Sequence, residues 1–238
     1  MLFVDGGNNV VGIGANNNTS YDSIAQTLLV ANESGHAGIT IRGGGTNPFN
    51  GIHFSDGVSG NSEKRAGRIM YQHEHDVMVF QTANAEKMRI DATGAVTKPL
   101  QPAFLAQPAS QQNNVSSDDT IAFGTEIFDQ NADFASNTFT APVTGKYQLS
   151  VALRMDNIDA ACDYFRIGIH TSNRNYFYLF EPDIGTSAGQ DITRFPAVLS
   201  ILADMDASDT ATVVVNFSGG TAQTDIITDS YFSVFLAC

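Results

Sequence analysis

Residues 138–153, TFTAPVTGKYQLSVAL, are the stretch that most constrains the fold of this chain. A short approach segment leads into a turn, and beyond the turn large apolar side chains alternate with polar or small ones, the apolar set being Tyr147, Leu149, Val151 and Leu153. Pro142 suits the second position of a tight turn, and Gly145 can adopt the positive φ that such turns need. An alternation with a period of two predicts a strand with one buried face, as in a β-sandwich.

Composition and charge agree with a turn-rich β protein and exclude some partners. Charged residues make up 16% of the chain, Gly occurs 21 times, and Trp is absent. The net charge of −13 is uneven, because residues 1–103 carry 9 acidic and 7 basic side chains whereas residues 104–238 carry 16 and 5. An acidic surface repels phosphate, so we expect no binding to nucleic acid. No apolar run is long enough to span a bilayer and the first residues do not resemble a signal peptide, so we expect no membrane insertion.

Residues 1–98 contain many short apolar segments separated by Gly and Asn. These segments predict strands at residues 2–4, 10–14, 27–30, 38–41, 51–54, 67–71, 77–80 and 87–90, and no helical periodicity of useful length occurs. Each strand has two or three apolar side chains, and ordering each residue costs about 1–2 kcal/mol. Identical chains wound around one another would bury these side chains and remove open sheet edges. The sequence therefore predicts an intertwined homotrimeric β shaft.

Two motifs in this region carry a resemblance to a known class of protein. Residues 8–14, NNVVGIG, resemble an Asn-x-Val-Gly-Ile-Gly element frequent in bacteriophage tail-fibre shafts, with one additional Val. The segments 67–73, 78–80 and 86–91, followed by Gly94, resemble the pattern that closes many such shafts. The long N-terminal region through which such fibres attach to a tail is missing, so we expect either a fragment or a distal fibre that docks on another protein.

The second half of the chain carries a different resemblance. Residues 99–103 contain two prolines, Pro99 and Pro102, which prevent continuous strand pairing on either side and therefore predict a hinge. From residue 104 onward, the FTAPVTGKY turn, the segment 120–130 and the closing strand YFSVFL at 231–236 resemble the globular head of complement component one, subcomponent q. This resemblance implies a jelly-roll β-sandwich of about ten strands that forms trimers around a three-fold axis.

Candidate catalytic and metal-binding groups are few. His73 and His75 would offer imidazoles on one face of a strand, but a hairpin turn with solvated side chains is the favoured interpretation. The acidic segment Asp204, Asp206 and Asp209 could hold calcium, but it lacks the features of a dedicated loop, and a solvated turn is favoured. Cys162 and Cys238 are interpreted as free thiols, and Cys162 lies too far from His170 along one strand for proton transfer. We expect no enzyme activity, no bound metal and no cofactor.

Aromatic residues and short polar loops are the remaining candidates for function. In segment 176–180, YFYLF, both faces of the expected strand are aromatic or apolar, so one face fills the core. The other face either lines a contact between chains or stacks on a sugar, and the contact between chains is the favoured interpretation. The residues expected to serve in core or trimer packing are Phe139, Tyr147, Tyr178 and Phe232. Polar loops with amide groups suit hydrogen bonding to glycan hydroxyls, although plain turns are the favoured interpretation of these loops. The candidate receptor-binding residues are Asp156, Asn157, Asn173, Arg174, Asn175 and Tyr176.

These expectations combine into one functional hypothesis with two alternatives. The chain is expected to be the distal part of a homotrimeric bacteriophage tail fibre in the virion, bound to other tail proteins, whose head attaches without covalent chemistry to a host cell-surface glycan or protein receptor. Three identical weak sites would gain avidity of about 10²–10⁴ over one site. The first alternative is a structural virion protein, a head fibre or fibre connector, whose head clamps the trimer. The second is a polysaccharide depolymerase.

Overall fold

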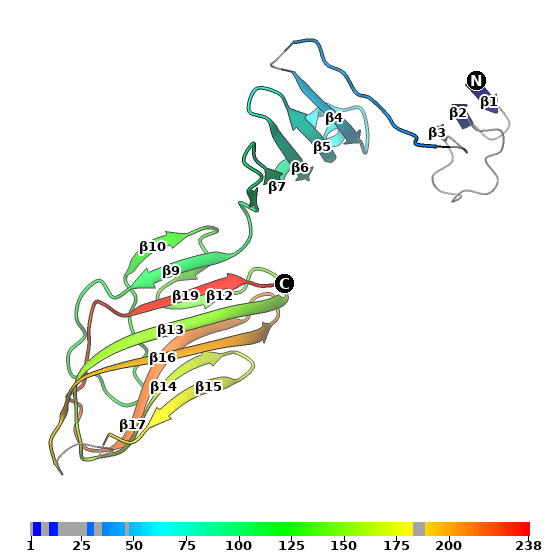
Figure 1. Ribbon diagram of the computed structural model, residues 1–238. Coiled ribbons are helices and arrows are strands. Elements are labelled where there is room, and N and C mark those ends of the chain that lie inside the picture. Colours follow the sequence, from blue (N-terminus) through cyan, green and yellow to red (C-terminus); the bar gives the residue numbers. More distant parts are fainter. Residues whose placement is uncertain (1, 6–9, 14–27, 31–34, 46–47, 183–188) are drawn as a thin grey trace. The chain divides into compact units, whose positions relative to one another are not determined.

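The computed structural model describes residues 2–5, 10–13, 28–30, 35–45, 48–182 and 189–238. The chain divides into two compact units, Met1–Thr97 and Lys98–Cys238, and both are built from β-strands (Figure 1). Within the described residues one short helix occurs, α1 at Gly60–Lys64. None of the described helical structure has the length and apolar character required to cross a membrane.

The first unit begins with a small sheet of three strands. These are β1 (Leu2–Asp5), β2 (Val10–Ile13) and β3 (Leu28–Val30). The pair β1–β2 is antiparallel and the pair β2–β3 is parallel. The sequence predicted strands at these three places, and it also predicted one at residues 38–41, which is wrong because that segment forms no ladder with another strand.

The larger sheet of the first unit is an antiparallel meander, which we call the β4–β8 sheet. Its strands are β4 (Phe49–Phe54), β5 (Gly67–Gln72), β6 (Val77–Thr82), β7 (Ala85–Ile90) and β8 (Val96–Thr97), paired in sequence order. Ala83 and Asn84 connect β6 to β7 with φ values of 50° and 57°. Positive φ at both central residues is the geometry of the two-residue hairpin turn that matches strand twist. Met70, Val77 and Val79 are the buried hydrophobic cluster in the described part of this unit.

The second unit is a sandwich of two antiparallel sheets (Figure 1). The β13 sheet has the order β10-β9-β19-β13-β16, with β18 also paired to β13; these strands are β9 (Ala103–Gln107), β10 (Thr125–Asp129), β13 (Gly145–Ile158), β16 (Ile192–Met205), β18 (Asp225–Ile226) and β19 (Tyr231–Leu236). The β14 sheet has the order β11-β12-β17-β14-β15; these strands are β11 (Phe134–Ala135), β12 (Thr138–Thr140), β14 (Cys162–Thr171), β15 (Asn175–Phe180) and β17 (Thr210–Gly219). The chain crosses repeatedly between the sheets, as in a jelly roll.

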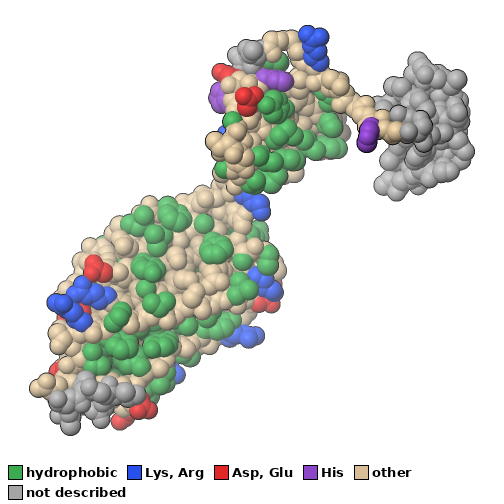
Figure 2. All heavy atoms as spheres, in the orientation of Figure 1, with side chains coloured by type: hydrophobic (Ala, Val, Ile, Leu, Met, Phe, Trp, Pro, Cys, Tyr) green, Lys and Arg blue, Asp and Glu red, His purple; other side chains and the backbone are tan. Residues whose placement is uncertain are grey.

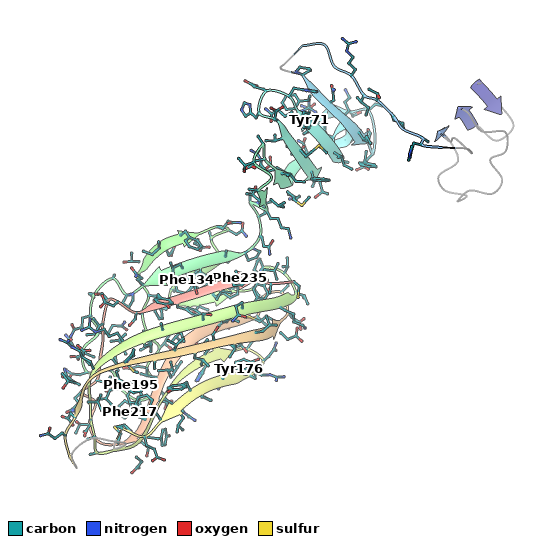
Figure 3. The ribbon with its side chains drawn as sticks, in the orientation of Figure 1. Tyr71, Phe134, Tyr176, Phe195, Phe217 and Phe235 are labelled. Atoms are coloured by element: carbon teal, nitrogen blue, oxygen red, sulfur yellow. The ribbon has the colours of Figure 1, made fainter. Side chains whose placement is uncertain are left out.

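Aromatic rings fill much of the space between the two sheets. Phe104 stacks on Phe134 at a centroid distance of 4.4 Å and meets Phe232 edge-on at 5.2 Å. A second row of rings crosses the sandwich, with Phe180 stacked on Phe195 at 4.1 Å and Phe165 stacked on Phe217 at 5.4 Å. Phe134, Phe195 and Phe217 are labelled in Figure 3. The core of the second unit is therefore complete within one chain.

The turn before β13 differs in one detail from the sequence prediction. Gly145 was expected to supply a positive φ, but it is the first residue of β13 and does not have a left-handed conformation. A Cβ at this position would lie 2.6 Å from Leu236 Cδ1 and 2.8 Å from the carbonyl oxygen of Cys238. Glycine is needed here because the C-terminal segment passes close to the backbone, which is the second common reason for a glycine in a strand.

The segment that joins the two units is hydrogen-bonded to the second unit. Leu236 donates its N–H to the carbonyl of Pro102 at 3.0 Å, and the Gln101 side chain donates to the carbonyl of Leu236 at 2.6 Å. The Gln130 amide donates to the carbonyls of Lys98 and Gln101 at 2.9 and 2.8 Å. These contacts fix the entry of the chain into β9.

Candidate functional site

The predicted receptor-binding residues lie at two opposite ends of the sandwich. Asp156 and Asn157 are at the end of β13, whereas Asn173 and Arg174 are in the turn between β14 and β15, and Asn175 and Tyr176 begin β15. The side chain of Asn173 donates to the carbonyl of Asp204, which pairs with Lys146 near the start of β13. A strand as long as β13 covers roughly 40 Å. The structure therefore does not bring the two groups together into one site.

The turn at Asn173 is held by hydrogen bonds within the protein. The Asn173 amide donates to Asp209 Oδ2 at 2.7 Å, and the same carboxylate oxygen accepts the backbone N–H of Asp206 at 2.8 Å. Asp204 forms an ion pair with Lys146. The acidic segment at Asp204–Asp209 is accordingly a turn closed by its own side chains. Within the described residues, no group of three or more acidic, His or Cys side chains is arranged to hold a metal ion.

The opposite end of the sandwich also uses its polar groups internally. Arg154 bridges Asp229 at 2.7 Å and Asp156 at 3.3 Å. Asn157 has a φ of 61° and donates to Asp225 Oδ2 at 3.0 Å. The left-handed backbone is one that Asn tolerates better than most residues. The positions and bonds of Asp156 and Asn157 are those of residues that shape a turn.

The four residues expected in packing differ in burial. Phe139, Tyr147 and Phe232 have no exposed surface, and the Tyr147 hydroxyl donates to the carbonyl of Val143 at 2.7 Å. Tyr178 is 42% exposed in the single chain, so it is not part of the buried core; a place in a contact between chains stays a prediction. Tyr176, labelled in Figure 3, is half-buried and packs against the core, although it was expected to face a receptor.

The candidate histidines lie in a turn, and the candidate Cys162 and His170 lie at different ends of one strand. His73 and His75 lie in the turn between β5 and β6, the interpretation that the sequence favoured, and His73 contacts the Asn50 amide at 3.1 Å. Burial raises the pKa of the Cys162 thiol to about 11, and nearby Asp159 adds to the effect. Cys162 is therefore a neutral thiol near pH 7, and His170 lies toward the other end of β14.

One face of the β4–β8 sheet is apolar and uncovered. The strand register places eight large side chains on this face: Ile52, Phe54, Ile69, Tyr71, Met78, Phe80, Met88 and Ile90. We call it the Ile69 face. None of the eight is buried in the single chain, and Ile52 and Phe54 are 51% and 56% exposed. Ile39 and Ile41 line a depression on this face and are themselves exposed.

The outer face of the β13 sheet is the second uncovered surface. Val198 and Leu202 on β16 are 60% and 58% exposed, and Tyr231 and Phe235 on β19 are 40% and 51% exposed. Between them lie the small or uncharged residues Gln148, Ser150, Ala152, Ser200 and Ser233. Figure 2 shows hydrophobic side chains spread over this face and charged side chains gathered toward its ends. A broad surface without charge in its centre has the composition of a contact between protein chains.

The outer face of the β14 sheet has a different character. Arg166 on β14 lies over the ring of Phe177 on β15, 4.1 Å from its centroid, and 5.6 Å from the centroid of the Tyr164 ring. His170 meets Phe177 edge-on at 5.2 Å. Burial, and then the charge of Arg166, lowers the pKa of His170, while Asp118 opposes that change. We call Tyr164, Arg166, His170 and Phe177 the Arg166 cluster.

The sequence prediction did not single out Arg166, and it considered His170 only as a partner for Cys162. A usable signal is present in segment 164–170, where Phe165, Ile167 and Ile169 are apolar and alternate with Tyr164, Arg166, Gly168 and His170. Alternation shows that the second set faces away from the core. It does not show that Phe177 on the next strand lies beside Arg166, because that depends on strand pairing.

Comparison with known proteins finds a match among solved structures and none in sequence. No family model and no curated protein matches the sequence. Among solved structures, 241 chains match, and one of them is the globular domain of a zebrafish complement 1qA protein. That match covers 58% of this chain and 98% of the zebrafish domain, with 13% sequence identity and a TM-score of 0.44. The function proposed below therefore rests on the residues of this chain.

Proposed function

We propose that this chain is the distal part of a homotrimeric bacteriophage tail fibre, in which residues 1–97 form a shaft and the jelly-roll unit attaches to a receptor on the host cell surface. Attachment is by non-covalent binding, and the partners are two further copies of the chain, other tail proteins and a host glycan or protein. The observation that carries the trimer is the uncovered Ile69 face of the β4–β8 sheet.

The Ile69 face leaves apolar surface in contact with water when the chain is alone. Its eight apolar side chains outnumber the three buried residues of the same sheet, Met70, Val77 and Val79. Ile52 and Phe54 are exposed and the other six are half-buried, so covering this face would add stabilisation toward the about 1.5–3 kcal/mol that full burial of a large apolar side chain provides. Three copies can cover it when the Ile69 face of each chain points toward a three-fold axis, because the heterologous contacts between neighbouring chains then close into a ring.

The outer face of the β13 sheet supports the same arrangement for the second unit. Exposed Val198, Leu202, Tyr231 and Phe235 surround a centre of small uncharged residues. Exposed aromatic and aliphatic side chains around a centre without charge are typical of interfaces. Two separate uncovered faces in the two units are what a chain that is trimeric along its whole length would have.

The role in a phage fibre is supported by the sequence patterns of the first unit. The NNVVGIG element and the closing pattern at residues 67–94 both resemble fibre shafts, and the second of these coincides with β5, β6 and β7. A sandwich that follows such a shaft is well placed to meet the receptor, and three copies on one head would add their affinities through avidity.

The oligomeric state is the first test. Light scattering on the purified full chain should give a mass of about three times 25.5 kDa at micromolar concentrations. Dilution into the nanomolar range should not release compact monomers, because the Ile69 face would then be exposed to water. A monodisperse, cooperatively folding particle of 25.5 kDa would contradict the proposal.

Receptor attachment is tested separately with intact cells. Fluorescently labelled trimer should bind to some members of a panel of bacterial strains, and unlabelled trimer should displace it. A trimer that binds no strain, but associates with other virion proteins, would favour the structural role of a fibre connector.

A further inference from the structure

The guanidinium of Arg166 has no acidic partner in the part of the chain that the structure describes. The ion pairs of the second unit involve Lys146 and Arg154, and none involves Arg166. Arg166 Nε is buried and makes no hydrogen bond. Arg174 and Arg194 of the same unit also form no ion pair among the described residues, but they are exposed, whereas Arg166 is half-buried. A buried donor without a hydrogen bond destabilises the fold.

The rings around Arg166 hold its guanidinium in a fixed orientation. Phe177 lies against one side at 4.1 Å, and Tyr164 contributes a second ring at 5.6 Å. The Tyr164 hydroxyl donates to Asn216 Oδ1 at 3.1 Å, and the Asn216 amide donates to Asp118 Oδ1 at 2.6 Å. Asn216 thus links Tyr164 to Asp118, and no ion pair joins Asp118 to Arg166. Because stacking uses the faces of the guanidinium, its N–H edge is free for a planar acceptor.

A glycine allows the rings of Phe177 and His170 to pack closely against β14 next to Arg166. Gly168 lies between Arg166 and His170 on the same face of β14, and a Cβ there would come within 2.9 Å of both Phe177 Cε1 and His170 Nε2. His170 Nε2 is buried without a hydrogen-bond partner. Phe177 remains 38% exposed and Leu179, which faces the same way, 53% exposed. The result is a fixed cation and an unsatisfied imidazole beside an exposed apolar surface.

We propose that the Arg166 cluster binds a carboxylate-bearing sugar of the host surface, with the carboxylate on the edge of the Arg166 guanidinium and the sugar ring against Phe177. A carboxylate matches the two parallel N–H donors of a guanidinium. The C–H face of a pyranose ring matches an exposed aromatic side chain.

The site remains open in the proposed trimer. It lies on the outer face of the β14 sheet, and the chain contacts proposed above use the outer face of the β13 sheet. Three copies would then present three sites. This inference rests on the proposed receptor-binding function and adds the chemical class of the receptor and the residues that select it.

The test measures binding of acidic and neutral sugars to the full-length protein by titration calorimetry. The acidic probes are trigalacturonic acid, a hyaluronan tetrasaccharide and 3′-sialyllactose; the controls are galactotriose, lactose and sodium acetate. At least one acidic sugar should bind, and its neutral counterpart and acetate should bind at least about 10-fold more weakly. Arg166→Gln should weaken that binding by about 10- to 100-fold, the range of a lost hydrogen bond to a charged group. Arg166→Lys should lose less, since it keeps the charge but not the planar edge.

Arg194→Gln is the matched control. It removes the same charge from the same unit, at an exposed position on β16 of the other sheet, and should leave the affinity unchanged. Variants are compared at wild-type mass, and if Arg166→Gln fails to assemble, the comparison is made with Arg166→Lys. Equal binding of neutral sugars, no binding of any acidic probe, or a loss in Arg194→Gln without one in Arg166→Gln would each overturn the assignment. Failure of the proposed function gives a different result, because the protein would then be a monomer or a trimer that binds no cells.

Discussion

Two phenylalanines on β19 show how position decides the effect of a residue. Phe232 is fully buried and contacts the rings of Phe104 and Phe123, whereas Phe235 points outward and is 51% exposed. We expect Phe232→Ala to destabilise the second unit by about 3–5 kcal/mol, because it leaves a cavity that the packed rings cannot fill. Denaturant unfolding followed by intrinsic fluorescence measures the loss.

Phe235→Ala is the control for that experiment, since it makes the same chemical change on the same strand. This variant should weaken the contact between chains and so raise the dissociation constant of the trimer. The free energy of unfolding of the jelly roll should change little. Equal destabilisation by the two variants at one protein concentration would show that the outward position is packed as tightly as the core.

His170 should make stability depend on pH in a defined direction. Its pKa is lowered in the folded chain because burial and the nearby Arg166 disfavour the imidazolium, with Asp118 partly opposing them and Phe177 covering the ring. The unfolded chain therefore takes up the proton first as pH falls. The stabilisation is present above the ordinary histidine pKa of about 6.5 and is lost as pH decreases through that value toward the folded pKa.

The expected result is a thermal midpoint that falls between pH 7.5 and 5.5 more steeply in the natural chain than in His170→Gln, with protein concentration held fixed. The two slopes would be the same if the imidazole were equally easy to protonate in both states.

At the residue scale, the sequence could predict which side chains are buried when the alternation within a single strand is sufficient to show it. The alternation in β13 identified Tyr147 as a core residue, and its fully buried side chain fits that pattern. The reason for Gly145 could not be predicted, since it depends on where the C-terminal segment passes. The same holds for Arg166 and Phe177, which lie on different strands and meet only through the register of β14 and β15.

At the element scale, β16 has one face in the core and one in water. Ala203 and Met205 are fully buried, while Val198 and Leu202 are exposed on the outer face of the β13 sheet. Leu202→Asp should therefore leave the far-ultraviolet circular dichroism unchanged and weaken the trimer, because three carboxylates would be brought into an apolar contact. Light scattering at falling protein concentrations measures the change in mass.

Leu179→Asp provides the comparison on the other sheet. Leu179 is 53% exposed, close to the 58% of Leu202, and it faces outward from the β14 sheet. It should keep the wild-type mass at every concentration. A trimer weakened by Leu179→Asp and not by Leu202→Asp would mean that the chains meet through the β14 sheet.

Strand positions were predictable because apolar periodicity and turn residues are local properties. The segments predicted at 67–71, 77–80 and 87–90 correspond to β5, β6 and β7. The segment at 38–41 was wrong, since GITI has strand-like composition but finds no partner strand within the chain. Strand pairing is non-local, and composition alone does not establish it.

At the scale of the whole molecule, the two units should depend on assembly to different extents. The second unit buries a continuous core of aromatic and aliphatic side chains within one chain, and the segment before β9 is hydrogen-bonded to it. The first unit has Met70, Val77 and Val79 as its buried cluster in the described residues and leaves the larger apolar face uncovered. A fragment of residues 98–238 should accordingly fold and form trimers, as its outer β13-sheet face predicts.

A fragment of residues 1–97 should behave differently at the same concentration. The described part of this fragment buries three apolar side chains, which do not offset a backbone ordering cost of about 1–2 kcal/mol per residue unless copies cover the Ile69 face. It should be either unfolded or trimeric, with no folded monomer between the two states, and circular dichroism combined with light scattering distinguishes these outcomes. If the fragment of residues 98–238 is a folded monomer while the full chain is trimeric, assembly is driven by the shaft. If the fragment of residues 1–97 is a compact monomer, the Ile69 face needs no partner, and the central reason for proposing a trimer is removed.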